Sequence, residues 1–107
     1  MSERQQHRVR KDLKHLRYLS EFASSVYPPG TVKRYLAALA PSQKVLGALN
    51  DATLARAEAL NHPKTDKGAR FAARWLKRSQ RALQGVAADR LRTAANAPPF
   101  WAASTED

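Results

Sequence analysis

Apolar side chains recur every three or four residues along most of this chain, which is the spacing of amphipathic α-helices. The first stretch predicts a helix that runs from about residue 6 to Val26, with Ser2 as its N-cap. Its apolar side consists of Leu13, Leu16, Leu19, Phe22, Ala23 and Val26. The segment Tyr27-Pro28-Pro29-Gly30 should end it, because neither proline donates a backbone hydrogen bond and glycine lets the chain turn.

A second helical region is predicted from about Val32 to Leu60, with Thr31 as N-cap. Its buried side should be made of leucines, namely Leu36, Leu39, Leu46, Leu49, Leu54 and Leu60. Pro41 lies inside this region, so we expect either a kink or a short break there. From Tyr35 to Asn61 the charges balance, with Lys44 and Arg56 against Asp51 and Glu58, which indicates a helix that serves mainly as scaffold.

A third helix is predicted after the turn at Asn61-His62-Pro63, with Thr65 or Asp66 as N-cap and an end near Ala95. Its apolar side should contain Phe71, Trp75, Leu76, Leu83 and Val86. Pro98-Pro99 should then stop the helix, and Phe100 and Trp101 should dock on the bundle before a disordered acidic end. Together the three regions predict an all-α antiparallel bundle of three long helices.

Composition narrows the class of partner. The chain has 107 residues, enough for one domain, and 19 Lys and Arg against 9 Asp and Glu give it a formal net charge of +10. That excess predicts attraction to polyanions, without choosing among nucleic acid, phosphate polymer and acidic membrane. The absence of cysteine excludes disulfides and thiol catalysis. No apolar run is long enough for a signal peptide or a membrane span, so we expect a cytoplasmic protein.

The cations of the first helix gather on one side. On a helical wheel one face of the stretch HRVRKDLKHLRY carries His7, Arg10, Lys11, Lys14, Arg17 and Tyr18. Val9, Leu13 and Leu16 fall on the opposite face, and Asp12 is the only acid between Arg4 and Arg17. Because like charges this close repel one another, the pattern predicts that a multivalent anion binds there.

The same stretch resembles the first conserved helix of the CHAD family, the conserved histidine α-helical domain. The segment from Gln43 to Asp51, QKVLGALND, resembles the second helix of that family, and Pro98-Pro99-Phe100-Trp101 resembles the end of many members. The resemblance implies a module that binds inorganic polyphosphate, needs no cofactor and lies in the cytoplasm on polyphosphate granules.

A complete CHAD domain is about twice as long and has two helical halves around a basic cavity, whereas this chain resembles the C-terminal half alone. We therefore expect one half-domain over residues 1–107, with a helical core at about 6–95 and a tail at 96–107. The missing half could come from a second copy in a homodimer or from another chain, or the piece could be divergent and bind more weakly.

A second basic stripe is predicted on the third helix. Arg70, Arg74, Lys77 and Arg81 fall within roughly 60° of one another on its wheel. Arg74, Lys77 and Arg81 could form a wall that faces the first helix across the ligand, and Lys44 should contribute. Solvated basic faces are common, so a purely structural role stays open for this stripe.

Enzymatic functions fit poorly. His7, His15 and His62 lack partners at metal-ligand spacing, and there is no glycine-rich phosphate loop or nucleophile elbow. The main alternative is a nucleic-acid-binding helical protein, although the aromatic residues fall among apolar positions rather than between the basic residues, where bases could stack. A scaffold protein with an incidental basic face is the third alternative.

Overall fold

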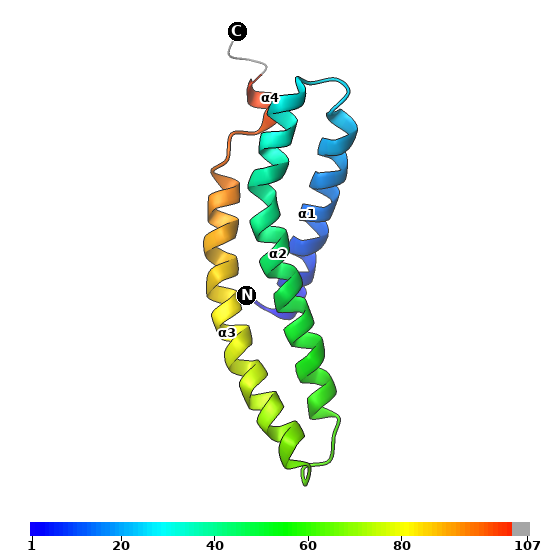
Figure 1. The fold of residues 1–107 in the computed structure, drawn as a ribbon, viewed down its shortest axis with the longest axis vertical. Coiled ribbons are helices and arrows are strands. Elements are labelled where there is room, and N and C mark those ends of the chain that lie inside the picture. The colour runs from blue at the N-terminus through cyan, green and yellow to red at the C-terminus, as the bar shows by residue number, and fades with distance from the viewer. Residues whose placement is uncertain (104–107) are drawn as a thin grey trace.

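The computed structural model describes residues 1–103, so the acidic end of the chain lies outside the described residues. It contains three long helices, α1 (Glu3–Ala23), α2 (Pro29–Leu60) and α3 (Lys67–Ala95), and a short helix α4 (Phe100–Ala103) (Figure 1). Consecutive long helices run antiparallel, and residues 1–103 contain no strand. The predicted all-α bundle of three long helices is confirmed.

α2 is the central helix. It packs against α1 on one side and against α3 on the other, and it also contacts α4. Figure 1 shows that α3 follows α2 over nearly its whole length, whereas α1 stops short of the end of α2 that leads into the turn before α3. The molecule is therefore elongated, with extents of 66 × 22 × 19 Å, and the end of the α2–α3 hairpin at this turn has no third helix beside it.

Two of the predicted N-caps are present. The hydroxyl of Ser2 accepts a hydrogen bond from the backbone N–H of Gln5, and the Gln5 side chain accepts one from the Ser2 N–H, which forms a capping box. At α3, the carboxylate of Asp66 accepts a hydrogen bond from the N–H of Ala69 at 3.0 Å. Both caps depend on neighbouring residues alone, which is why sequence spacing located them.

The predicted Thr31 cap is wrong. α2 begins at Pro29, and Pro28 is its N-cap. A proline in the first turn has a suitable φ, and the N–H that it lacks would have had no intrahelical acceptor there. A break at Pro41 is also excluded, because α2 continues through this residue as one helix. Pro41 is exposed, so the side of the helix that loses a hydrogen bond faces solvent.

α1 ends at Ala23, three residues before the predicted end. The hydroxyls of Ser24 and Ser25 donate to the carbonyls of Glu21 and Phe22, and such local hydrogen bonds compete with helix continuation. Leu19, Phe22 and Val26 were expected in the core, and all three are exposed.

The helices pack through residues seven positions apart, the repeat of antiparallel helices that meet along one seam. α1 buries Gln6, Leu13 and Ser20. α3 buries Ala73, Gln80, Ala87 and Ala94, and these mostly small side chains let its backbone lie close to α2. On α2 the core contains Val32, Tyr35, Leu39, Val45, Leu46 and Leu49. The hydroxyl of Ser42, which is fully buried, links α2 to α3 by donating to the carbonyl of Arg90 at 3.1 Å.

Several apolar side chains that were predicted to be buried lie in solvent. On the hairpin these are Leu54, Leu60, Phe71, Trp75 and Val86. The predictions for these five residues were wrong. None of these five side chains belongs to the seam between the two helices, which α3 fills with Ala73, Gln80, Ala87 and Ala94. Two packed helices enclose only the side chains along their common seam.

The predicted docking of the tail is confirmed. Phe100 is buried, and its ring lies edge-on to the rings of Tyr27 and Tyr35, with centroids 4.9 and 5.6 Å away. The ring of Trp101 contacts Tyr35 at 5.5 Å. These aromatic contacts fix the chain after Pro98-Pro99 against the first turns of α2.

Candidate anion-binding groove

A groove of about 280 Å³ lies between α1 and α2. The side chains that the sequence placed on one face of α1 all line it: His7, Arg10, Lys11, Lys14, Arg17 and Tyr18. Leu13 also lines the groove, and α2 contributes Gln43 and Gly47. The structure therefore brings the six predicted residues of α1 together around a single concavity.

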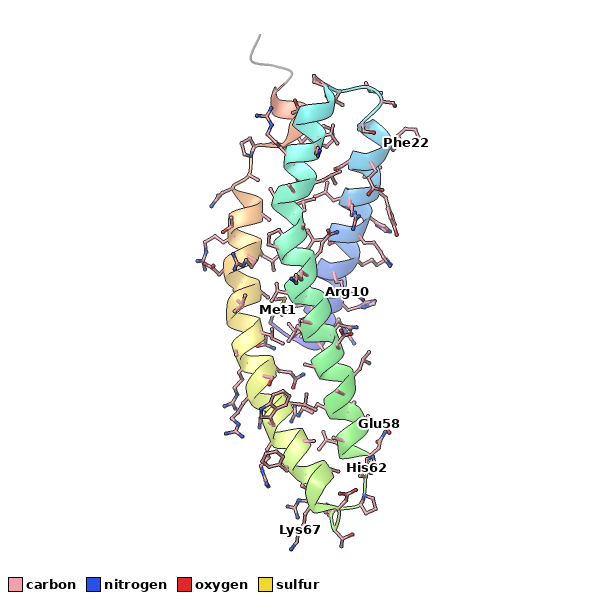
Figure 2. All side chains as sticks on the ribbon, in the orientation of Figure 1. Met1, Arg10, Phe22, Glu58, His62 and Lys67 are labelled. Atoms are coloured by element: carbon pink, nitrogen blue, oxygen red, sulfur yellow. The ribbon has the colours of Figure 1, made fainter. Side chains whose placement is uncertain are left out.

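The seven-residue repeat of α1 explains this arrangement. Gln6, Leu13 and Ser20 turn toward the bundle, so the positions beside this stripe lie along the edge where α1 meets α2. Arg10 occupies such a position, beside α2 (Figure 2). The apolar stripe that buries α1 thus also fixes the direction in which its cations point.

The opposite wall is low because Gly47 has no side chain. Apart from the adjoining residues and backbone of its own helix, a Cβ atom built on Gly47 would have no protein atom within 4 Å, so packing between helices does not require glycine at this position. Glycine in a helix interior costs about 1 kcal/mol relative to alanine. The protein therefore carries a local cost in stability at the α2 position that lines the groove beside Gln43.

Most of the positive charge in the groove is not neutralised by carboxylates of the protein. Arg17 pairs with Glu21, with 3.1 Å between Nε and Oε1, and both side chains are about half exposed. Exposed pairs of this kind contribute roughly 0–1 kcal/mol, so Glu21 competes only weakly with an external anion. Within residues 1–103, no carboxylate lies in ion-pair distance of His7, Arg10, Lys11 or Lys14.

A second hollow, of about 190 Å³, continues the groove toward the start of α1. It shares His7 and Arg10 with the groove, and Leu46, Asn50 and Thr53 of α2 line it as well. Asn50 thus lies beside the cationic row, whereas Asp51 is exposed and lines neither concavity.

The α3 stripe lies elsewhere. Lys77 and Arg81 line a third hollow, of about 320 Å³, together with Arg56 and residues from the start of α1. Lys44 and Arg74 line none of the three concavities. The wall that faces α1 across the groove is α2, because α2 lies between α1 and α3. The expected facing wall of Arg74, Lys77 and Arg81 is therefore wrong as a description of the groove.

Sequence reasoning missed the role of Arg56, which was counted among the balanced charges of a scaffold helix. Its Nη1 donates to the Gln80 side chain at 3.4 Å, and its buried Nε has no hydrogen-bond partner within residues 1–103. No local signal distinguishes Arg56, because its position depends on how α3 packs on α2. Gln43 and Gly47, by contrast, are four residues apart, a spacing that places both on one side of a helix.

The described part of the chain holds neither a metal-ligand cluster nor a helix that could span a membrane. No three His, Cys, Asp or Glu side chains gather where they could hold a metal ion. None of the helices there is both long and apolar enough to cross a membrane.

Comparison with known proteins gives one match. The model of the CHAD domain family matches residues 1–60, which include α1, α2 and both walls of the groove. No curated protein and no solved structure matched the chain. α3 and α4 lie outside the match, which does not say which half of a CHAD domain this chain represents. Because the match spans more than half of its residues and contains the whole cationic row, the chain belongs to the CHAD family.

Proposed function

We propose that this protein is a non-enzymatic module that holds inorganic polyphosphate along the α1–α2 groove. CHAD domains are associated with polyphosphate binding. The observation that carries the proposal is that the six predicted side chains of α1 line one groove, and that only Arg17 among its cations is paired with a carboxylate in the described part of the chain.

The chemistry of these side chains suits a phosphate polymer. Arginine offers a planar set of donors that matches phosphate oxygens, and lysine offers a compact charge. From His7 to Tyr18 the row extends over about 16 Å at 1.5 Å per residue, long enough for several consecutive phosphates. His7 adds an imidazole N–H donor, and the hydroxyl of Tyr18 can donate to a phosphate oxygen.

The remaining predicted cations have a secondary role in this proposal. Glu3 lines both the second and the third hollow, and its carboxylate would repel a polyanion that passes between them. Lys44, Arg74, Lys77 and Arg81 would therefore act at longer range, by raising the positive potential around the groove.

A second copy of the chain, or a related half-domain, would close the groove from its open side. This part of the proposal rests on the exposed apolar side chains of α1, Leu19 and Phe22. Light scattering with and without long-chain polyphosphate tests it. A mass that doubles with ligand supports a shared cavity, and a monomer that binds polyphosphate at unchanged mass contradicts it.

The binding experiment compares two charge reversals of equal size. Arg10→Glu with Lys14→Glu changes the groove, whereas Lys64→Glu with Lys67→Glu makes the same change in net charge in the turn between α2 and α3 and at the first residue of α3. We expect the groove variant to lose at least about tenfold in affinity for polyphosphate. The slope of log affinity against log salt concentration should also become shallower, by about 0.7 for each lost phosphate contact. Equal losses in the two variants would show attraction to net charge alone.

The granule location and the choice of polyanion need separate measurements. In competition at one salt concentration, long-chain polyphosphate should displace duplex DNA, and DNA should not displace polyphosphate. The opposite order would favour nucleic acid as the ligand of the groove. A fluorescent fusion that remains diffuse in cells rich in polyphosphate granules would contradict the proposed location.

A further inference from the structure

The outward face of α3 carries two aromatic rings in an unusual setting. Phe71 is 61% exposed and Trp75 is 55% exposed, although helical periodicity placed both on the apolar side. The seam residues Ala73 and Gln80 are buried against α2, so the two rings lie on the side of α3 that faces solvent. The sequence pattern counted against nucleic-acid binding because the aromatic residues fell among apolar positions. The exposure of Phe71 and Trp75 removes that objection for α3.

The charges around these rings are uniformly positive. From residue 67 to residue 88, α3 contains no acid, and its first four turns carry Lys67, Arg70, Arg74, Lys77, Arg78 and Arg81. Arg74 lies three residues after Phe71, and Arg78 lies three residues after Trp75, so each ring has a guanidinium on the neighbouring turn. In the described residues none of these six cations pairs with a carboxylate.

We infer that this face of α3, defined by Phe71, Arg74, Trp75 and Arg78, is a second binding surface whose ligand is single-stranded nucleic acid. Exposed aromatic rings among cations are the combination that binds single strands, because bases stack on the rings while phosphates contact the charges. Phe71 and Trp75 are one turn apart, roughly 6 Å along the axis. When a base lies between two rings, the rings are separated by about twice the ~3.4 Å spacing of stacked bases. This separation is similar to the axial distance between Phe71 and Trp75.

Three other occupants suit this face less well. A duplex offers the same phosphates but keeps its bases stacked inside, so it would leave both rings in water. A second copy would bring the same cations against this face, and like charges would repel. A membrane-bound amphipathic helix separates its apolar and cationic faces, whereas here the guanidinium groups lie beside the rings and the apolar seam is buried against α2.

The surface is separate from the α1–α2 groove. Phe71, Arg74, Trp75 and Arg78 line none of the three concavities, and α3 lies outside the family match. The inference therefore does not depend on polyphosphate binding at the groove, and each of the two proposals can fail without the other.

The test compares an oligothymidylate with an abasic oligomer of the same length, which keeps the phosphates and lacks the bases. A Trp101→Phe background leaves Trp75 as the only tryptophan, so that its fluorescence reports stacking directly. We expect the oligothymidylate to bind more tightly than the abasic strand and to quench Trp75. Phe71→Ala with Trp75→Ala should weaken binding of a labelled oligothymidylate by about tenfold or more and remove the preference over the abasic strand.

Matched variants separate stacking from general effects. Phe22→Ala removes an 82% exposed ring from α1 and should leave oligothymidylate binding unchanged. Arg10→Glu with Lys14→Glu should weaken polyphosphate binding while the quenching of Trp75 persists. Equal affinity for the two oligomers, or full binding by the Phe71→Ala, Trp75→Ala variant, would overturn the inference. Quenching of Trp75 by vesicles of phosphatidylserine and phosphatidylcholine, without quenching by oligothymidylate, would also overturn it and assign the face to membranes.

Discussion

Thr53 on α2 accepts a hydrogen bond from Gln80 on α3, with 2.8 Å between Oγ1 and Nε2. The Thr53 hydroxyl in turn donates to the carbonyl of Leu49 at 2.9 Å, and the Gln80 side-chain oxygen accepts from Arg56. Gln80 stands in a seam that α3 otherwise fills with alanine. A polar residue at one position of an apolar seam favours a single register of two helices, because sliding one helix leaves the polar group without its partners.

The first prediction concerns this hydrogen bond. Gln80→Ala leaves the Thr53 hydroxyl without its donor and the Arg56 side chain without its acceptor, so it should lower the free energy of unfolding by about 1–3 kcal/mol in urea titrations. Gln84→Ala is the matched control, because the hydrogen bond of Gln84 to the Met1 carbonyl is exposed. We expect less than about 0.5 kcal/mol for this control. Similar values for both variants would show that the α2–α3 link carries no special stability.

A second prediction tests the close packing of α3 on α2. Ala87 is completely buried and Ala88 is exposed. Ala87→Leu forces extra volume into a seam of small residues and should destabilise the protein by about 1–3 kcal/mol or more. Ala88→Leu makes the same chemical change in solvent and should stay within about 0.5 kcal/mol of the wild type. Equal thermal midpoints for the two variants would contradict the orientation of α3 about its own axis, in which Ala87 faces α2 and Ala88 faces solvent.

Features set by neighbouring residues were predictable from the sequence. The caps at Ser2 and Asp66 need only residues three positions away, and the ends at Leu60 and Ala95 follow from local breaks in periodicity. The cationic face of α1 was predictable for a related reason. α1 has a single apolar face, so burying this face against the bundle also fixes the direction in which the cations point.

Burial on the hairpin could not be read in the same way. A helical wheel identifies a stripe of apolar residues, but it does not say whether another helix lies beside each turn. α1 does not reach the end of α2 at Leu60, and Leu54 lines the hollow beside the start of α1 but stays exposed. On α3 the seam is built mostly from alanine rather than from Phe71 or Trp75. The order of helices across the bundle likewise decided that α2, and not α3, forms the second wall of the groove.

The third prediction concerns alkaline pH. Burial raises the pKa of Tyr35 above its ordinary value of 10.0, because a phenolate is poorly solvated among Phe100 and Trp101. Below pH 10 the Tyr35 phenol is neutral in the folded and the unfolded protein, so burying it costs no stability through ionisation. As the pH rises above about 10, the unfolded chain loses the proton first, so stability falls until the pH passes the folded pKa.

Tyr35→Phe keeps the ring and removes the ionisation. Thermal midpoints measured from pH 9 upward should therefore fall less steeply for Tyr35→Phe than for the wild type. Tyr18→Phe, at an exposed position, should follow the wild-type curve. A Tyr35→Phe curve parallel to that of the wild type would show that the buried phenol does not contribute to alkaline unfolding.

The last prediction separates ligand binding from stability at Gly47. A Cβ at this position meets nothing in the protein, and the residue lines the groove, so Gly47→Leu should fill the space where a polyphosphate chain would lie. Because leucine favours a helix more than glycine does, the free energy of unfolding should stay the same or rise by up to about 1 kcal/mol. Calorimetric titration with polyphosphate should nevertheless show a loss of about tenfold or more in affinity, since one methylene-sized clash already costs 1 kcal/mol or more. Gly85→Leu, at an exposed helical position on α3 where an added Cβ likewise meets nothing, should bind polyphosphate normally and show a similar stability change. If Gly47→Leu binds as well as Gly85→Leu does, the ligand does not lie in the α1–α2 groove, whatever the affinity of the protein for polyphosphate.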